Sequence, residues 1–333
     1  MSLPGEGAGL TLGLNAVIFA VTHDRPRVLT VRRTDHALTA PGPEAGRPDG
    51  LPFGPLDPGG DRTLELGLRG WVRQQTGLEL GYVEQLYTFG DRHRDPRERA
   101  GGPRVLSIAY LALVREGGLA GAGLARWRDV YTFLPWEDWR GGRPRLVEDE
   151  IEPRLAAWAR AAPDRASRRE RRERSALAFG TLGGQFDAEA VLERYQLMYE
   201  AGLVQEHARD HPEATAPGAG AGEAMALDHR RLLATALGRL RGKLEYRPVV
   251  FELVGEDFTL LQLQRVVEAL AGMHLHKQNF RRLVEKSGLV EPTGGSERRT
   301  GGRPAALFRF RREVLRERRS AGVGLPGVRR TGT

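Results

Sequence analysis

The chain has 333 residues with a net charge of +8, and 40% of its residues are hydrophobic. It contains no cysteine, which excludes disulfides, thiolate nucleophiles and cysteine-based zinc sites. No apolar run reaches the ~18 residues of a membrane-spanning helix, and the start lacks the basic and apolar regions of a signal peptide, so we expect a cytoplasmic protein without membrane contact.

Two strands are predicted near the N-terminus, at residues 14–21 and 26–33, because both runs are rich in β-branched and aromatic residues. A loop rich in Pro and Gly follows, up to residue 50. The second strand ends in Arg32 and Arg33, whose guanidinium groups could fork onto phosphate oxygens. A solvated strand end is an equally good interpretation of these two arginines.

Residues 51–80 predict a short extended segment, a turn rich in Pro and Gly, and a helix from about Thr63 to Thr76 that ends at Gly77. This loop and helix resemble the Nudix box, whose paired metal-binding glutamates fall on Gln74 and Gln75. Magnesium sites in proteins depend on charged carboxylate oxygens, which glutamine does not supply. The resemblance therefore implies a Nudix-like domain that is not an enzyme and has no catalytic residues, metal or cofactor. An ordinary amphipathic helix is the alternative.

Strands at residues 82–90, 104–114 and from 126 complete the element order of a Nudix α/β/α sandwich. The run from Gln85 to Arg97, with residues 105–110, resembles the Nudix-like domain of the NrtR family, the Nudix-related transcriptional regulators of NAD metabolism. This resemblance implies a sensor of ADP-ribose or a related nucleotide effector. The ligand-binding residues that we expect, with the two aromatic rings stacking on a base, are Arg32, Arg33, Phe89, Asp91 and Tyr110.

The middle of the chain predicts a helical connector. Helices are expected from Pro153 to residue 162, in the Arg-rich segment 163–175 as a helix or connector, and at residues 187–201, capped by Asp187 and closed by Gly202. The apolar residues of the last helix, Tyr195 among them, are interpreted as core or interface. A flexible Pro/Gly/Ala linker is predicted at residues 207–224.

Charge is distributed unevenly along the chain. Residues 229–333 contain 22 Lys and Arg against 10 Asp and Glu, whereas the first 228 residues contain 29 against 33. A basic domain joined to a mildly acidic remainder is the asymmetry expected of a nucleic-acid-binding protein.

The C-terminal elements predict a winged helix-turn-helix: a helix capped by Asp228, an extended segment at residues 246–254, two helices from Thr259 and from Lys277, and a hairpin at residues 289–311. The same stretch resembles the C-terminal domain of the NrtR family. The second helix of the pair is expected in the major groove and the hairpin on phosphates or in the minor groove. The DNA-binding residues that we expect are Thr259, Lys277, Gln278, Asn279, Arg281, Arg282, Thr293, Arg298, Arg299 and Arg303. A protein-binding winged helix is the alternative.

Three segments are expected: a Nudix-like effector-sensing domain at residues 1–145, a helical connector and linker at 146–224, and a winged-helix DNA-binding domain at 225–320. We interpret the chain as a DNA-binding transcriptional regulator, a repressor, with an inactive Nudix-like domain. The resemblance implies a homodimer on palindromic double-stranded DNA that the nucleotide effector releases. An active Nudix pyrophosphohydrolase and an RNA-binding protein are the rival hypotheses.

Overall fold

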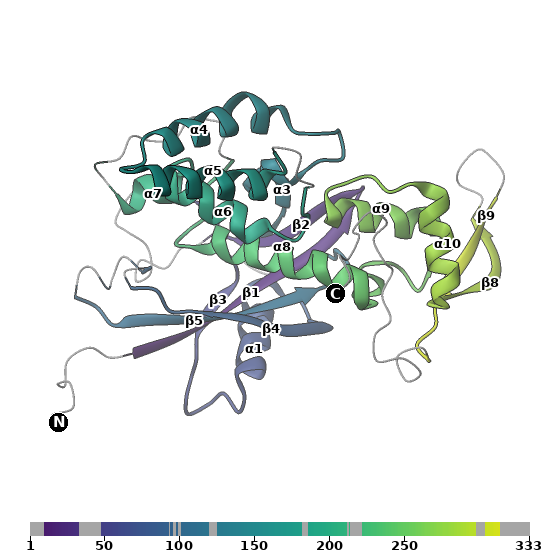
Figure 1. Cartoon of the computed structure of the whole chain (residues 1–333). Helices are drawn as coiled ribbons and strands as arrows, with labels where there is room; N and C mark the ends of the chain where they lie inside the picture. Colours follow the sequence, from purple (N-terminus) through teal and green to yellow (C-terminus); the bar gives the residue numbers. More distant parts are fainter. Residues whose placement is uncertain are drawn as a thin grey trace.

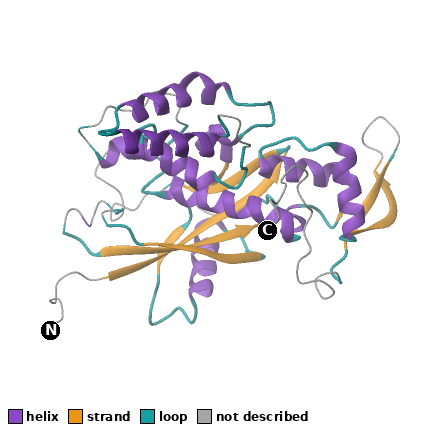
Figure 2. Ribbon diagram, viewed as in Figure 1, coloured by secondary structure: helices purple, strands orange, loops and turns teal. Residues whose placement is uncertain are grey.

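The computed structural model describes residues 10–32, 48–92, 94–95, 98, 101–119, 125–181, 186–211, 213, 222–297 and 304–313. A mixed sheet occupies the middle of the molecule, with one helix on one face and a group of helices on the other, whereas the winged helix lies at one end (Figures 1 and 2). The predicted α/β sandwich followed by helices and a winged helix is confirmed.

The sheet has six strands in the order β4-β5-β1-β2-β6, with β3 paired to β1, and its central pair β1 and β5 is parallel. Strand β1 is buried on both faces, which explains its unbroken run of apolar residues. The turn to β2 uses His23 and Asp24, both with positive φ, as in a two-residue hairpin. The strand bounds are β1 Leu10–Thr22, β2 Arg25–Val31, β3 Phe53–Pro55, β4 Tyr82–Phe89, β5 Arg104–Leu113 and β6 Ala125–Asp129.

Helix α1 (Leu64–Thr76) covers one face of the sheet and has the predicted ends. The Thr63 side chain accepts a hydrogen bond from the Leu66 amide, and Gly77 has a φ of 72°, a backbone conformation that glycine adopts without a steric penalty. The helix predicted from residue 63 to residue 76 is therefore confirmed.

The opposite face of the sheet is covered by α8 (His229–Tyr246) and α9 (Leu260–Ala271), and the middle-segment helix α6 packs on α8 (Figure 1). The helices of the middle segment differ from the prediction at two starts, and α7 occupies residues 207–210, where a flexible linker was predicted. Helical structure begins before Pro153, because a π-helical turn precedes it and the proline lies in the first turn of α4, where its missing N–H breaks no helical bond. Helix α6 begins at Val191, since Asp187 accepts a bond from the Glu189 amide in the turn before it. The bounds are α3 Val130–Phe133, a 3-10 turn Pro135–Glu137, the π-helix Val147–Ile151, α4 Glu152–Arg160, α5 Arg165–Phe179, α6 Val191–Glu200 and α7 Gln205–Asp210.

The winged helix follows helix α8, and two predictions for this part of the chain are wrong. The segment expected to be extended at residues 246–254 forms a 3-10 helix at Val249–Leu253, and the short strand comes later, at β7. Asp228 precedes α8 but makes no capping bond, because its carboxylate pairs with Arg94. The bounds are α8 His229–Tyr246, β7 Asp257–Phe258, α9 Leu260–Ala271, α10 Lys277–Ser287, β8 Val290–Glu297 and β9 Ala305–Phe310.

Two apolar cores lie on opposite faces of the sheet. A small core joins the sheet to α1, and a larger one runs from the other face through the middle helices into α9 and α10. The winged helix therefore shares a core with the sheet. Among the described residues, no helix combines the length and the apolar character needed to cross a bilayer.

Candidate functional site

The face of α1 that carries the box is occupied by side chains bonded to β3. The Gln75 amide nitrogen donates to the Phe53 carbonyl at 2.6 Å, and the Gln75 amide oxygen accepts from the Phe53 amide at 3.2 Å. One turn earlier, the Trp71 indole donates to the Pro55 carbonyl at 2.8 Å, and its ring lies over Gly54, where any Cβ would collide with it. These side chains tie the helix to the strand.

The carboxylates beside this helix are bonded to other groups: Asp61 accepts from the Asp57 amide, and Glu79 pairs with Arg73. Glu65 pairs with Arg69 at 2.8 Å within α1, and Gln74 is exposed. Burial, with a contribution from the Glu65 charge, raises the pKa of Tyr110 on the same face. No cluster of three or more His, Asp or Glu side chains positioned to hold a metal ion occurs within the described part of the chain.

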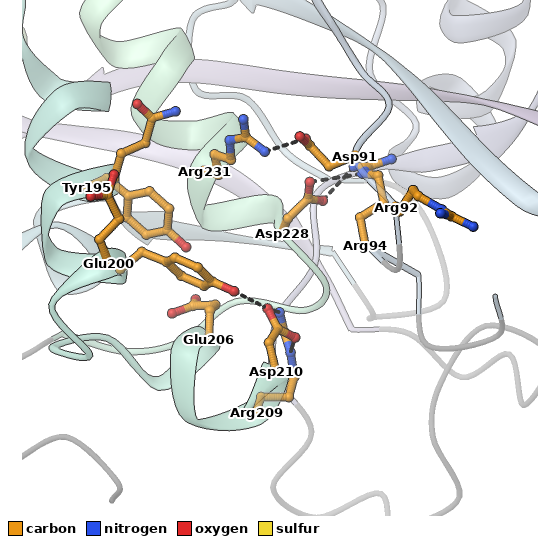
Figure 3. A pocket seen from close by; sticks show the side chains of 12 residues that line it. Asp91, Arg92, Arg94, Tyr195, Glu200, Glu206, Arg209, Asp210, Asp228 and Arg231 are labelled. Carbon is orange, nitrogen blue, oxygen red and sulfur yellow. Dashed lines mark hydrogen bonds and ion pairs between the residues drawn. The ribbon is translucent and has the colours of Figure 1, made fainter. Parts of the chain in front are cut away.

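A cavity of about 410 Å³ lies on the other side of the sheet (Figure 3). One wall comes from the segment after β4, with Asp91, Arg92 and Arg94, and a second from the start of α8, with Asp228 and Arg231. Helices α6 and α7 complete it with Tyr195, Gln196, Tyr199, Glu200, Glu206, Arg209 and Asp210. The cavity therefore joins the Nudix-like sheet to the middle segment and to α8.

Ion pairs across the cavity link its walls. Arg231 of α8 donates to Asp91 at 2.6 Å, and Arg94 donates to both carboxylate oxygens of Asp228, at 2.5 and 3.0 Å. The Arg94–Asp228 pair is almost fully buried, whereas the Asp91 side chain is 58% exposed. An exposed pair opens at lower cost than a buried one, so Arg231 is the more available cation.

The expected ligand-binding residues do not form one group. Phe89 and Asp91 lie near the cavity, but Phe89 is buried beneath Arg94 and Arg231, so its ring has no free face for a base. Tyr110 is buried in the core on the opposite face of the sheet. Arg32 is exposed after β2 and contacts none of the others among the described residues, and Arg33 lies outside the described residues.

Several residues that line the cavity were not predicted from the sequence as site residues. Tyr195 does belong to the core, as interpreted, but it also lines the cavity, together with Tyr199 and Glu206. Their helices come from the segment whose role the sequence left open. Asp228 was interpreted as a cap because it precedes a helix, and its partner Arg94 lies 134 residues earlier in the chain.

The outer face of α10 is the second candidate site. Phe280 and Val284 are buried and anchor the helix, whereas the predicted base-reading face is exposed along its length, with Lys277, Gln278, Asn279, Arg281 and Arg282. Helix α9 in front of it begins with a capping box, in which Thr259 and Gln262 bond reciprocally.

Of the other residues predicted to contact DNA, two are hydrogen-bonded within the winged helix and three lie outside the described residues. Thr259 is buried and serves as the cap of α9, so its hydroxyl is unavailable and we leave it out of the DNA-contacting set. Thr293 donates to the Leu307 carbonyl across the hairpin. Arg298, Arg299 and Arg303 lie outside the described residues.

Comparison with known proteins finds similarity in the C-terminal part of the chain. Residues 250–310 match the NrtR DNA-binding winged helix domain. A curated relative, the ADPR responsive transcriptional repressor NtrR of Acinetobacter baylyi, is 42% identical over 86 residues, which are 26% of this chain and 34% of that protein. The chain thus aligns with about a third of that repressor's length.

Solved structures match nearly the whole chain. Shewanella oneidensis NrtR, crystallised with a 27mer DNA, gives a TM-score of 0.55 at 22% identity, over 92% of this chain and 95% of that chain. A MutT/nudix family protein from Enterococcus faecalis gives a TM-score of 0.52 at 16% identity, over 93% of this chain and 90% of that chain. At these identities the likeness establishes the fold, which is a Nudix-like domain followed by a winged helix. Residues 250–310 of this chain are therefore similar to the NrtR DNA-binding winged helix domain, and the chain as a whole shares its fold with Shewanella oneidensis NrtR.

Proposed function

We propose that this protein is a DNA-binding transcriptional repressor whose Nudix-like domain binds an ADP-ribose-like nucleotide and does not hydrolyse it. The observation that carries the proposal is the outer face of α10, where five cationic or amide side chains stand exposed over a helix anchored in the core. Arginine reads guanine and glutamine or asparagine reads adenine in the major groove. The domain match and the name of the Acinetobacter repressor support the same function.

The box supports binding without hydrolysis. A Nudix-type reaction needs carboxylates that fix a divalent ion and its water, but the Gln75 and Trp71 side chains are committed to the backbone of β3. We therefore expect no Mg²⁺-dependent release of AMP from ADP-ribose. Turnover of about 1 per second or more, the range of ordinary enzymes, would instead support the rival pyrophosphohydrolase.

DNA recognition is tested on α10 with duplexes selected for binding. Arg281→Ala or Gln278→Ala should cost about 1–3 kcal/mol on the selected site and much less on unrelated duplexes, since a bidentate base contact is lost. Arg169→Ala is the matched control, because Arg169 is also an exposed helical arginine and lies on α5, far from α10 (Figure 1). Fluorescence anisotropy at several salt concentrations measures both affinities. Unchanged selectivity in the α10 variants would make the winged helix a protein-interaction module.

The repressor is proposed to act as a homodimer. A dimer would place its two α10 helices on half-sites about 10 base pairs apart, or a multiple of that spacing. Footprinting on selected duplexes tests this arrangement, and one isolated half-site per bound chain would contradict it. The genes of NAD metabolism are the targets that follow from the family.

A further inference from the structure

The turn between α9 and α10 is held by two buried side chains of α9. Gln264 and Glu268 lie one helical turn apart, and the Gln264 amide nitrogen donates to the Glu268 carboxylate at 2.8 Å. The same carboxylate oxygen accepts from the Leu275 amide at 2.9 Å, and the Gln264 amide nitrogen also donates to the Leu275 carbonyl at 2.9 Å. The backbone N–H and C=O of Leu275 are therefore both bonded to side chains of α9.

Leu275 lies two residues before α10, and the start of α10 has no cap of its own. His276, which directly precedes the helix, makes no side-chain capping bond within the described part of the chain. Helix α9, by contrast, begins with the capping box of Thr259 and Gln262. The bonds to Leu275 therefore hold the backbone from which α10 starts.

The beginning of the turn is held as well. Gly272 follows α9 with a φ of 70°, and its carbonyl accepts from the Trp139 amide at 2.7 Å. With residues 272 and 275 both bonded, the direction of α10 relative to α9 is restricted. A helix that reads bases with its first residues requires such restriction, because a hydrogen bond weakens steeply when donor and acceptor are misaligned.

We propose that Glu268 is a positioning residue for DNA recognition. Its carboxylate is buried and acts through the Leu275 amide, which directs the exposed side chains at the start of α10, Lys277 and Gln278, toward the bases. This inference rests on the proposed function. It adds a residue outside the exposed face of α10 to those on which sequence selectivity depends.

The test separates selectivity from stability. Glu268→Ala removes the acceptor of the Leu275 amide, so affinity for the selected duplex should fall about tenfold or more. Affinity for unrelated duplexes depends on phosphate contacts and should fall less than about threefold. Gln262→Ala is the matched control, because it breaks the capping box at the other end of the same helix. It should lower the melting temperature but keep the parent's ratio of the two affinities, which anisotropy titrations measure.

Glu268→Gln tests whether the bond or the charge is required. The glutamine oxygen can accept from the Leu275 amide, and its nitrogen would face His274 Nδ1, which lies 3.3 Å from the second carboxylate oxygen. This variant should keep the parent's selectivity within about twofold. Hydrogen exchange in the DNA-free chain gives a second readout, since the Leu275 amide should exchange faster in Glu268→Ala and at the parent's rate in Glu268→Gln and Gln262→Ala.

The contrary outcomes are distinct. If Glu268→Ala lowers the affinities for both duplexes equally, or lowers neither, Glu268 does not position α10 and the proposed function still stands. A loss of selectivity in Glu268→Gln with the Leu275 amide still protected would also contradict positioning through this bond. If the parent chain itself shows no preference between duplexes, the proposed function fails, and this inference fails with it.

Discussion

Glu137 is the residue on which the packing of several elements depends. Its carboxylate is fully buried and accepts bonds from Arg194 at 2.6 and 2.8 Å and from Arg241 at 2.6 Å. The two arginines come from α6 and α8, so one carboxylate joins the end of the sheet domain to both helices. Burial alone would raise the pKa of Glu137, but Arg194 and Arg241 outweigh it and hold the pKa below its ordinary value of 4.5.

Glu137→Gln should lower the free energy of unfolding by about 3–5 kcal/mol at pH 7, because two buried guanidinium groups lose their counter-charge. Because the folded-state pKa is depressed, the stabilisation is complete above pH 4.5 and is lost as the pH falls through the folded value. Urea unfolding at pH 7 and pH 4 should therefore show a smaller difference between variant and parent at pH 4. Glu173→Gln on the exposed face of α5 is the control, at about 0.5 kcal/mol or less.

Helix α1 shows how an element keeps its shape after its chemistry has changed. Its cap, its closing glycine and its apolar face are those of the predicted helix, and Gln75 now uses both ends of its amide on Phe53. A glutamate there could accept from the Phe53 amide but would face the Phe53 carbonyl with a negative charge. The glutamine is therefore a structural residue at this position.

Gln75→Glu should accordingly destabilise the chain by about 1–3 kcal/mol, the cost of unpairing a buried carbonyl. Gln74→Glu is the matched control, because the neighbouring glutamine is exposed and its replacement should be nearly neutral. Chemical unfolding with and without Mg²⁺ measures both effects. Stabilisation of Gln75→Glu by Mg²⁺ would show that the helix retains a latent metal site.

Local signals identified the elements better than the sites. The helix starts at Thr63 and Thr259 and the closing residue Gly77 could be predicted because each is decided within a few residues of chain. The faces of Phe89 and Tyr110 could not, since they depend on the pairing of β4 with β5, which is interrupted by a register shift between Gln85 and Tyr87. The long-range ion pairs of the cavity have no local signature.

At the scale of the whole molecule, α8 connects the cavity with the winged helix. Its start contributes Asp228 and Arg231 to the cavity, and Arg241 near its end donates to the Leu270 carbonyl of α9 at 3.0 Å. The end of α9 is also held by Tyr131, which donates to the Ala269 carbonyl at 2.6 Å, and Gly272 accepts from the Trp139 amide. Contacts from α8 and from the sheet domain therefore meet at the end of α9, next to the DNA-reading helix α10.

Tyr131→Phe should weaken this coupling without touching either binding site. The variant removes the bond that the Tyr131 hydroxyl donates to the Ala269 carbonyl and the longer bond that it accepts from Arg241. At about 1 kcal/mol for this loss, the ratio of DNA affinities without and with ADP-ribose should fall about fivefold. The affinity for ADP-ribose in the absence of DNA should stay unchanged. Tyr87→Phe should keep the parent ratio, because Tyr87 is 59% exposed on the edge strand β4. Anisotropy titrations of the selected duplex at zero and saturating ADP-ribose measure the ratio.

If Tyr131→Phe and the parent release DNA equally, the contact between residue 131 and α9 does not transmit the effector signal, and the coupling must run through the other contacts of α8.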